Sequence, residues 1–347
     1  MTRFGYHASH EQHRPSELLE YVTLAESAGF EAAMCSDHFH PWTDAQGQSG
    51  FAWSWLGAAL QATFLSFGTV NAPGSRYHPA IVAQAAATLA EMFPERLWVA
   101  IGSGEALNEA ITGEAWPTKP ERNARLKECA DVMRALWRGE TVTHRGRVTV
   151  QEARLYTLPD VPPPLFGAAL SPETAELVGG WADGLMTQGA PRDSIEKILE
   201  AFWRGGGEEK PVFVQHGLSW AETEDDARRA AHEQWRFSAL GGEVLPMLRT
   251  PGQFDAASRF VTPDDVARVL RVSADLAQHV AWLEDYIDLG IDTVYLFNVN
   301  RNQREFINAF GERVLPSVVG KGLARASATT RRVTADADRD TQRSRQP

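Results

Sequence analysis

The sequence predicts an α/β protein, a (β/α)8 TIM barrel with insertions, on three observations. Short apolar segments that suit strands alternate with longer amphipathic segments that suit helices. Eight such alternations follow one another along 347 residues, a length that a single barrel can fill. Hydrophobic residues make up 43% of the chain, which is enough for a large core. An open doubly wound sheet is the alternative fold.

The first half of the chain contains four strand candidates separated by helix candidates. The strand candidates are the apolar segments 3–8, 30–36, 65–72 and 96–104. Helix candidates lie at 15–29, which ends at a glycine, at 79–93, which begins with proline, and at 120–139. Residues 141–155 alternate like a hairpin around a glycine turn, outside the main pattern.

The second half resumes the same alternation. Its strand candidates are 163–170, 182–188, 211–220 and 291–299, and its helix candidates are 171–181, 222–237, 275–290 and 302–319. Residues 238–261 are expected to form an irregular insertion. We therefore expect a barrel domain over residues 1–320. Residues 321–347 lose apolar side chains and gain charge, serine and threonine, which predicts a disordered tail.

Composition excludes several classes of protein. The net charge of -11 argues against nucleic acid or an anionic membrane as a partner. Cys35 and Cys129 are far apart in sequence, which suits the reducing cytoplasm rather than a disulfide framework. The chain has no apolar run of about 18 residues, so no membrane span is expected. A small molecule is the expected partner.

The barrel prediction makes a geometric statement about the site. Active sites of such barrels lie at the carboxyl ends of the strands. Segments 36–42, 71–78 and 102–108 follow the second, third and fourth strand candidates. We therefore expect these segments, which have unusual compositions, to share one face of the barrel.

The segment "CSDHFHPW" (35–42) admits two kinds of chemistry. His38 and His40 form an H-x-H pair, but zinc needs three or four ligands, and the other strand ends offer only His216. No metal site is therefore predicted. His38 beside Asp37 is a plausible proton donor or acceptor. The alternative is a histidine that caps the strand or bonds a backbone carbonyl.

Two further segments suit a ligand or an ordinary helix start equally well. The glycines of "GSGEALNE" (102–109) let a ligand approach the backbone and place Glu105 at the barrel mouth; a tight turn before a helix explains them too. Ser171 and Pro172 suit the first positions of a helix. Such a helix start can hold a phosphate, or can simply be capped.

Three segments taken together resemble a known family. "SDHFHPW" (36–42), "GTVNAPGSRYHPAIVAQAAATLAEMFPERLWVAIGSGEALNE" (68–109) and "ITGEAWP" (111–117) resemble the luciferase-like monooxygenase superfamily. Within it they look most like the branch around the deazaflavin-dependent glucose-6-phosphate dehydrogenases. The similarity runs over about residues 3–319. It implies a barrel that holds a flavin-type ring at the carboxyl ends of its strands.

The resemblance also implies residue roles. His38, Trp42 and Glu105 match catalytic positions: the active-site histidine, a tryptophan that stabilises charge, and a proton donor or acceptor. A cis peptide is implied between Thr69 and Val70, behind the ring. The remaining positions implied to contact the cofactor are Asp37, Asn108, Thr187 and, around its phosphate, Ala168, Ala169, Leu170 and Ser171.

Two departures from the branch bear on substrate and cofactor. The sugar-phosphate enzymes have a lysine where this chain has Ala190, which disfavours glucose 6-phosphate. Leu170 adds bulk where the branch has glycine, beside the long tail of coenzyme F420, so the sequence favours FMN over F420.

The overall expectation is a flavin-dependent oxidoreductase that moves hydride between the ring and a small organic substrate. With FMN and oxygen it would be a monooxygenase, with a flavin reductase as partner. The alternatives are a deazaflavin-dependent sugar or alcohol dehydrogenase and a non-catalytic flavin-binding protein. The resemblance further implies a cytoplasmic homodimer.

Overall fold

The computed structural model describes residues 1–318, and these form the predicted closed barrel of eight parallel strands. Neighbours around the ring follow the order β1-β2-β3-β4-β7-β8-β9-β11, and β11 pairs with β1 to close it. The barrel strands are β1 (Arg3–Ala8), β2 (Ala32–Cys35), β3 (Ser66–Asn71), β4 (Leu97–Ile101), β7 (Leu165–Ala168), β8 (Gly184–Gln188), β9 (Val212–Ser219) and β11 (Thr293–Asn298). The predicted tail, 321–347, lies outside the described residues.

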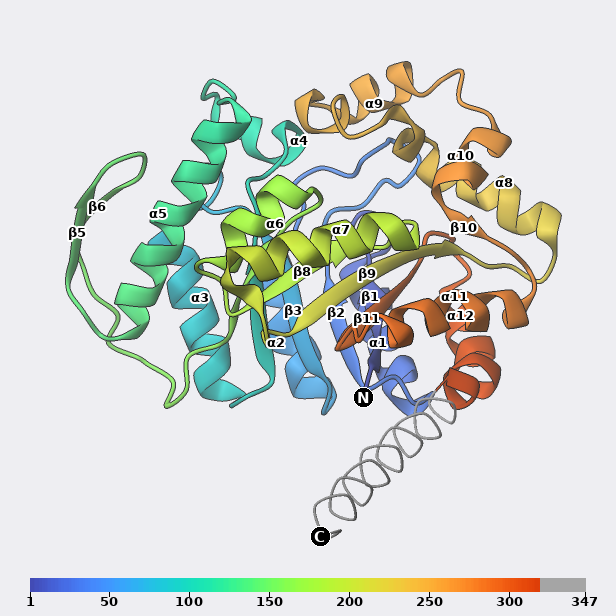
Figure 1. The fold of residues 1–347 in the computed structure, drawn as a ribbon, viewed down its shortest axis with the longest axis horizontal. Coiled ribbons are helices and arrows are strands. Elements are labelled where there is room, and N and C mark those ends of the chain that lie inside the picture. The colour runs from blue at the N-terminus through green and yellow to red at the C-terminus, as the bar shows by residue number, and fades with distance from the viewer. Residues whose placement is uncertain (319–347) are drawn as a thin grey trace, which may run out of the picture.

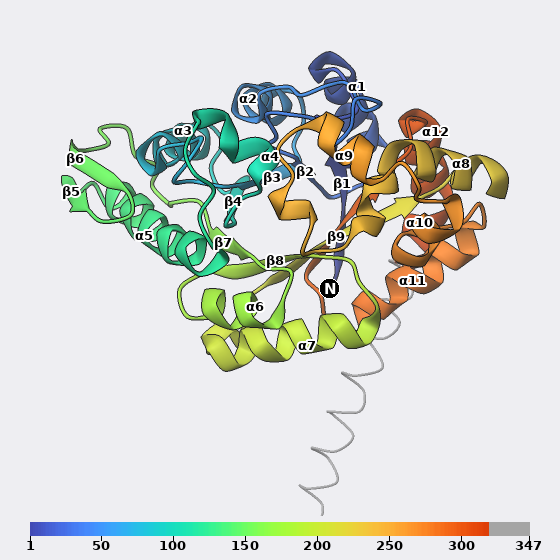
Figure 2. The ribbon, with the colours of Figure 1, turned by 90° about the horizontal axis from the view of Figure 1, so that it is seen from above.

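Helices form a layer around the barrel, as Figure 2 shows. They are α1 (Pro15–Ser27), α2 (Ala52–Ala62), α3 (Pro79–Met92), α5 (Lys119–Trp137), α6 (Pro172–Gly179), α7 (Arg192–Phe202), α8 (Glu224–Trp235), α11 (Leu276–Asp288) and α12 (Gln303–Ala309). No helix within residues 1–318 is both long and apolar enough to cross a membrane.

The barrel interior is filled by large side chains that alternate with residues facing the helices. Trp98, Phe166, Phe213 and Tyr295 pack together there, and Trp98 Nε1 donates a hydrogen bond to the Tyr295 hydroxyl over 2.9 Å. Gly68 makes room for this packing, because a Cβ at that position would lie 1.8 Å from the Trp98 ring. The interior is a packed core rather than a channel.

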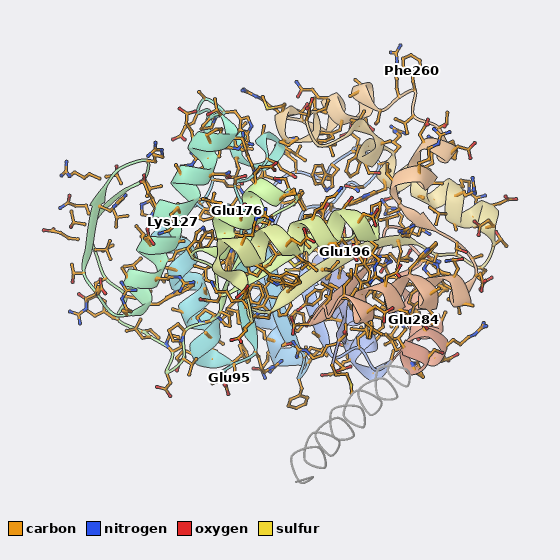
Figure 3. The ribbon with its side chains drawn as sticks, viewed as in Figure 1. Glu95, Lys127, Glu176, Glu196, Phe260 and Glu284 are labelled. Carbon is orange, nitrogen blue, oxygen red and sulfur yellow. The ribbon has the colours of Figure 1, made fainter. Side chains whose placement is uncertain are left out.

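Segments outside the eight-fold pattern lie on two sides of the barrel. β5 (Val142–Arg145) and β6 (Thr149–Ala153) form the predicted antiparallel hairpin beside α5 (Figure 1). The expectation of an irregular insertion over 238–261 was only partly right, because the segment contains α9 (Pro251–Ala257). α10 (Pro263–Val269) and the short strand β10 (Arg271–Val272) follow it. Phe260, between α9 and α10, projects into solvent (Figure 3).

The carboxyl ends of the strands lie at the top of Figure 1, where α4 (Ala106–Glu109) and α9 cross the barrel mouth. The N-terminus lies at the opposite end. This arrangement follows from parallel pairing: every strand ends at the same edge of the sheet. The loops that follow β1, β2, β3 and β4 therefore converge on one face.

Candidate active site

The loops after β2, β3 and β4 share one face of the barrel, as predicted. Asn108 of α4 accepts hydrogen bonds at Oδ1 from the backbone N–H of Phe39 (2.9 Å) and of His40 (3.4 Å). The backbone N–H of Arg76 donates to Glu109 Oε2 over 2.8 Å. Buried polar side chains thus tie the three loops together at the mouth.

Asp37 is the central group of this network. Its buried carboxylate accepts from the Tyr77 hydroxyl (3.1 Å), contacts Arg76 Nη1 (3.4 Å), and accepts from Asn71 Nδ2. Arg76 also donates to the backbone carbonyl of Asp37 over 2.8 Å. The carboxylate is thereby held in the loops and turned toward Arg76, whereas sequence adjacency had suggested that it partners His38.

The carboxylate that faces His38 is Glu11, which the sequence analysis missed. His38 Nδ1 lies 3.5 Å from Glu11 Oε1. The other oxygen, Oε2, accepts from the hydroxyls of Ser9 (2.9 Å) and Ser36 (2.5 Å). Burial alone would raise the pKa of Glu11, but His38 and the Ser36 hydroxyl together hold it below its ordinary value. Glu11 is therefore an anion beside the His38 ring.

Glu105 lies immediately before α4, close enough for the charges of His38 and Glu11 to act on its carboxyl. Withdrawal from water raises the pKa of its carboxyl to about 7. The nearby His38 opposes the rise, whereas Glu11 adds to it. The site thus combines a histidine paired with an anion and a carboxyl that exchanges its proton near neutral pH, the combination that general acid–base catalysis requires.

Trp42 forms an aromatic wall beside His38. The two ring centroids are 4.9 Å apart. On its other side Trp42 stacks on Phe237 at 4.8 Å and meets the edge of Phe254 at 5.3 Å. Phe254 belongs to α9, so the inserted segment packs over the barrel mouth through Trp42.

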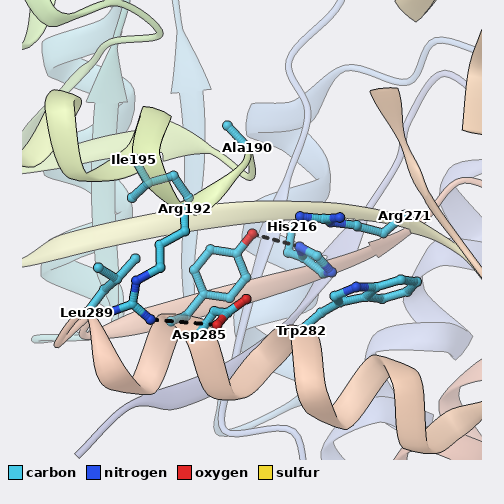
Figure 4. A pocket seen from close by; sticks show the side chains of 9 residues that line it. Ala190, Arg192, Ile195, His216, Arg271, Trp282, Asp285 and Leu289 are labelled. Carbon is cyan, nitrogen blue, oxygen red and sulfur yellow. Dashed lines mark hydrogen bonds and ion pairs between the residues drawn. The ribbon is translucent and has the colours of Figure 1, made fainter. Parts of the chain in front are cut away.

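His40 and His216, the other two candidates for a metal site, both point elsewhere. His40 Nδ1 donates to the backbone carbonyl of Leu107 over 2.9 Å. His216 lies on the side of β9 that faces the helices, where its Nδ1 hydrogen-bonds to the Tyr286 hydroxyl (2.8 Å) beside a cavity between α7 and α11 (Figure 4). Across residues 1–318 no group of three histidine, cysteine or acidic side chains is placed to hold a metal ion.

The segment expected around a cofactor phosphate lies between β7 and α6. Ser171 caps α6, since its Oγ accepts from the Thr174 N–H over 3.4 Å. Ala168 ends β7 and Ala169 is buried behind it, whereas 61% of the Leu170 surface is exposed. The Leu170 side chain therefore extends into solvent, which weakens the argument that its bulk excludes the F420 tail. Thr187 is buried on β8 next to this segment.

Comparison with known proteins places this site in a family, because the luciferase-like monooxygenase family model matches residues 1–293. The chain belongs to the luciferase-like monooxygenase family. An F420-dependent glucose-6-phosphate dehydrogenase of Beutenbergia cavernae is 35% identical over 329 residues, which cover 91% of this chain and 97% of that protein. The corresponding enzyme of Mycobacterium avium is 33% identical over 330 residues, which cover 90% and 97%.

Solved structures of luciferase-like proteins agree. An F420-dependent secondary alcohol dehydrogenase in complex with an F420-acetone adduct superposes with a TM-score of 0.84 at 35% identity, covering 91% of this chain and 99% of that one. An F420-dependent tetrahydromethanopterin reductase of Methanopyrus kandleri shares the fold, with a TM-score of 0.72 at 20% identity. The relatives at 33–35% identity are named as F420-dependent, so they support the deazaflavin alternative and give no support to FMN.

One expectation drawn from the luciferase-like resemblance was wrong. The Thr69–Val70 peptide bond is trans, as are all others in the described chain. β3 remains a regular parallel strand through this position, with Thr69 opposite both Cys35 of β2 and Val99 of β4. The Thr69 hydroxyl donates to the Cys35 carbonyl over 3.1 Å. Pairing with β4 continues through Val70 and Asn71 and keeps the backbone extended here.

The mouth residues fit a planar cofactor ring. Val70 and Ala100 lie side by side at the interior ends of β3 and β4, and Gly102, just after β4, adjoins Ala168 at the end of β7; a Cβ added at Gly102 would lie 3.3 Å from Ala168 Cβ. His38 Nδ1 is turned toward Glu11, at 3.5 Å, and the His38 ring lies beside the Trp42 ring. Small strand-end residues beside two aromatic rings suit a ring-bearing ligand.

A second group of mouth residues also escaped the sequence analysis. Gln188 donates to Gln215 over 3.4 Å, and Gln215 Nε2 lies 3.3 Å from the His7 ring. These side chains join the ends of β8, β9 and β1. Each lies at an interior-facing strand position near a carboxyl end, so strand alternation could have identified them once the barrel was assumed.

Proposed function

We propose that this protein is an F420-dependent dehydrogenase that oxidises a small, uncharged alcohol. The observation that carries the proposal is the arrangement of His38, Glu11 and Glu105 around one mouth whose small strand-end residues suit a planar ring. The F420-dependent relatives, at 33–35% identity over nearly their full length, support the choice of cofactor.

The chain supplies binding and proton transfer. F420, when bound, would accept the hydride that leaves the substrate carbon. His38 is placed to take the proton of the substrate hydroxyl, and the anionic Glu11 stabilises the ring once it is charged. Glu105 is placed to hold or release a second proton near neutral pH. Trp42 and the segment packed on it shield the reacting groups from water.

An uncharged substrate is favoured over a sugar phosphate. Glu11 is an anion beside His38, and its charge disfavours a substrate dianion at the same place. Ala190 lies where the sugar-phosphate enzymes have lysine, and it borders the separate cavity beside His216 rather than the mouth. A secondary alcohol, the substrate class named for one structural relative, fits these charges better.

The deciding experiment is a titration of purified protein with F420 and, separately, with FMN, followed by deazaflavin or flavin fluorescence. We expect saturable binding of F420 and none of FMN at micromolar concentration. Addition of secondary alcohols should then bleach the oxidised F420 absorbance, and glucose 6-phosphate should not. Binding of FMN but not of F420 would overturn this proposal and support the FMN-dependent monooxygenase alternative.

Several expectations remain predictions. These are the homodimer, the cytoplasmic location and the single barrel domain spanning residues 1–320. A flavin reductase partner belongs to the FMN alternative only. A non-catalytic flavin-binding role predicts ligand binding without any turnover, which the alcohol assay distinguishes directly.

A further inference from the structure

A row of cations borders the mouth on the first two turns of α5. Lys119, Arg122 and Arg125 are spaced three residues apart, so they lie along one side of the helix. None of the three forms an ion pair with any carboxylate among residues 1–318. Glu105 attracts Lys119 and Arg122 from beyond ion-pair distance, but burial favours the neutral form of its carboxyl, so the row keeps an excess of positive charge.

The row is in contact with the loops of the candidate site. Lys119 Nζ donates to Ser103 Oγ over 2.6 Å, directly after β4. The Arg122 guanidinium lies 4.4 Å above the Trp116 ring. Arg125 packs against Gly74, in the loop after β3. Ser103 follows Gly102, and Gly102 adjoins Ala168. Ala168 begins the short segment that ends at Ser171, the N-cap of α6.

Buried polar atoms beside the row have no partner. Arg122 is only 6% exposed, yet its Nε is unpaired, as are Trp116 Nε1 and Asn123 Oδ1. Burying a donor without a partner is unfavourable, and such groups in a native fold point to a ligand or ordered water. Withdrawal from water, with Arg122 nearby, lowers the pKa of Lys119, as expected of crowded cations.

We propose that Lys119, Arg122 and Arg125 bind the anionic tail of the cofactor, a phosphodiester followed by glutamate carboxylates. This inference rests on the proposed F420-dependent function. A tail whose phosphate lies at the start of α6 would pass Ser103 and reach Lys119, and several separated negative charges match several separated cations. A phosphate carried by the substrate is the other source of the same chemistry.

The test compares F420 with its tailless deazaflavin riboside, using the double variant Lys119→Gln/Arg125→Gln. Both ligands carry the same ring, so fluorescence quenching gives a dissociation constant for each. We expect the variant to bind F420 at least about tenfold more weakly and the riboside unchanged, because charge-assisted hydrogen bonds to the tail are lost. The salt dependence of F420 binding should also fall.

Lys127→Gln is the matched control. Lys127 (Figure 3) lies on the same helix, and 43% of its side chain is exposed. It pairs with Asp131 over 2.6 Å. The substitution removes one positive charge but leaves Lys119, Arg122 and Arg125 unchanged. The dissociation constants of F420 and of the riboside should therefore both stay unchanged. A melting curve for each variant confirms that the fold is intact.

Two outcomes overturn the inference alone: equal weakening of both ligands, or no weakening of either. Weaker binding of glucose 6-phosphate with unchanged F420 binding also overturns it, by assigning the row to a substrate phosphate. Failure of the unmodified protein to bind either deazaflavin instead overturns the proposed function, and this inference with it.

Discussion

Glu11 and His38 contact each other at the barrel mouth, with Nδ1 3.5 Å from Oε1, although they follow different strands, β1 and β2. Two serine hydroxyls bond the far oxygen of the carboxylate and leave the near one for the imidazole. This geometry supports the proposal that His38 acts as the base and that Glu11 positions its ring.

Replacing His38 by alanine should remove a proton acceptor while leaving the cofactor site intact. We expect turnover to fall by about 10²–10⁴-fold with an unchanged dissociation constant for F420. Glu11→Gln should cause a smaller loss, and the double variant should be no slower than His38→Ala, because both act through one ring. Additive losses in steady-state rates would show that Glu11 acts independently.

Glu105 predicts a pH dependence of stability. Its folded pKa of about 7 lies above the ordinary 4.5, so between these values the folded state holds the proton more tightly than the unfolded state. Stability from this group is therefore complete below about pH 4.5 and is lost as the pH rises to about 7. Melting temperatures of Glu105→Gln should lack this loss; identical profiles for both proteins would contradict the shift.

Phe254 should anchor the inserted segment. It is fully buried against Trp42 and Phe237, so Phe254→Ala should cost about 3–5 kcal/mol locally and accelerate hydrogen exchange over residues 236–257. Phe260→Ala is the control: 79% of this side chain is exposed, and its loss should change stability by less than about 0.5 kcal/mol. Similar exchange rates in the two variants would remove Phe254 from this role.

Two glycines should respond oppositely to alanine. At Gly68 a Cβ would collide with Trp98 at 1.8 Å, so we expect a loss of at least about 1–3 kcal/mol in denaturant unfolding. At Gly57, inside α2, the nearest atom would lie at an ordinary 3.6 Å. Gly57→Ala should therefore be neutral or stabilising by up to about 1 kcal/mol. A stable Gly68→Ala protein would show that the Trp98 packing is different.

The alternation of strands and helices was readable from the sequence because parallel strands are short apolar runs. Residues 3–8 were predicted with the bounds of β1. α2 was not singled out, since its apolar residues surround the helix and its N-cap, Phe51, offers no polar side chain. α7 and α10 also went unnoticed. These helices are specified more by packing on the barrel than by local signals.

The site was only partly predictable for a related reason. His38, Trp42 and Glu105 lie in local motifs, and the structure brings them to one mouth. Glu11 has no local signal, because its contact with His38 depends on the tertiary pairing of β1 with β2. The partner of Asp37 was misjudged for the same reason: Asp37 lies in the loop after β2, and its partners Arg76 and Tyr77 come from the loop after β3.

The packing of Phe237 and Phe254 against Trp42 has a consequence for the evolution of new specificities. The segment that covers the mouth is held by a side chain that also borders the reacting groups. Random libraries that vary this segment will therefore disturb catalysis whenever they lose the aromatic contact. Libraries confined to the exposed positions of this segment, such as Phe260, would keep the aromatic contact with Trp42. Such libraries could change substrate specificity with little loss of turnover.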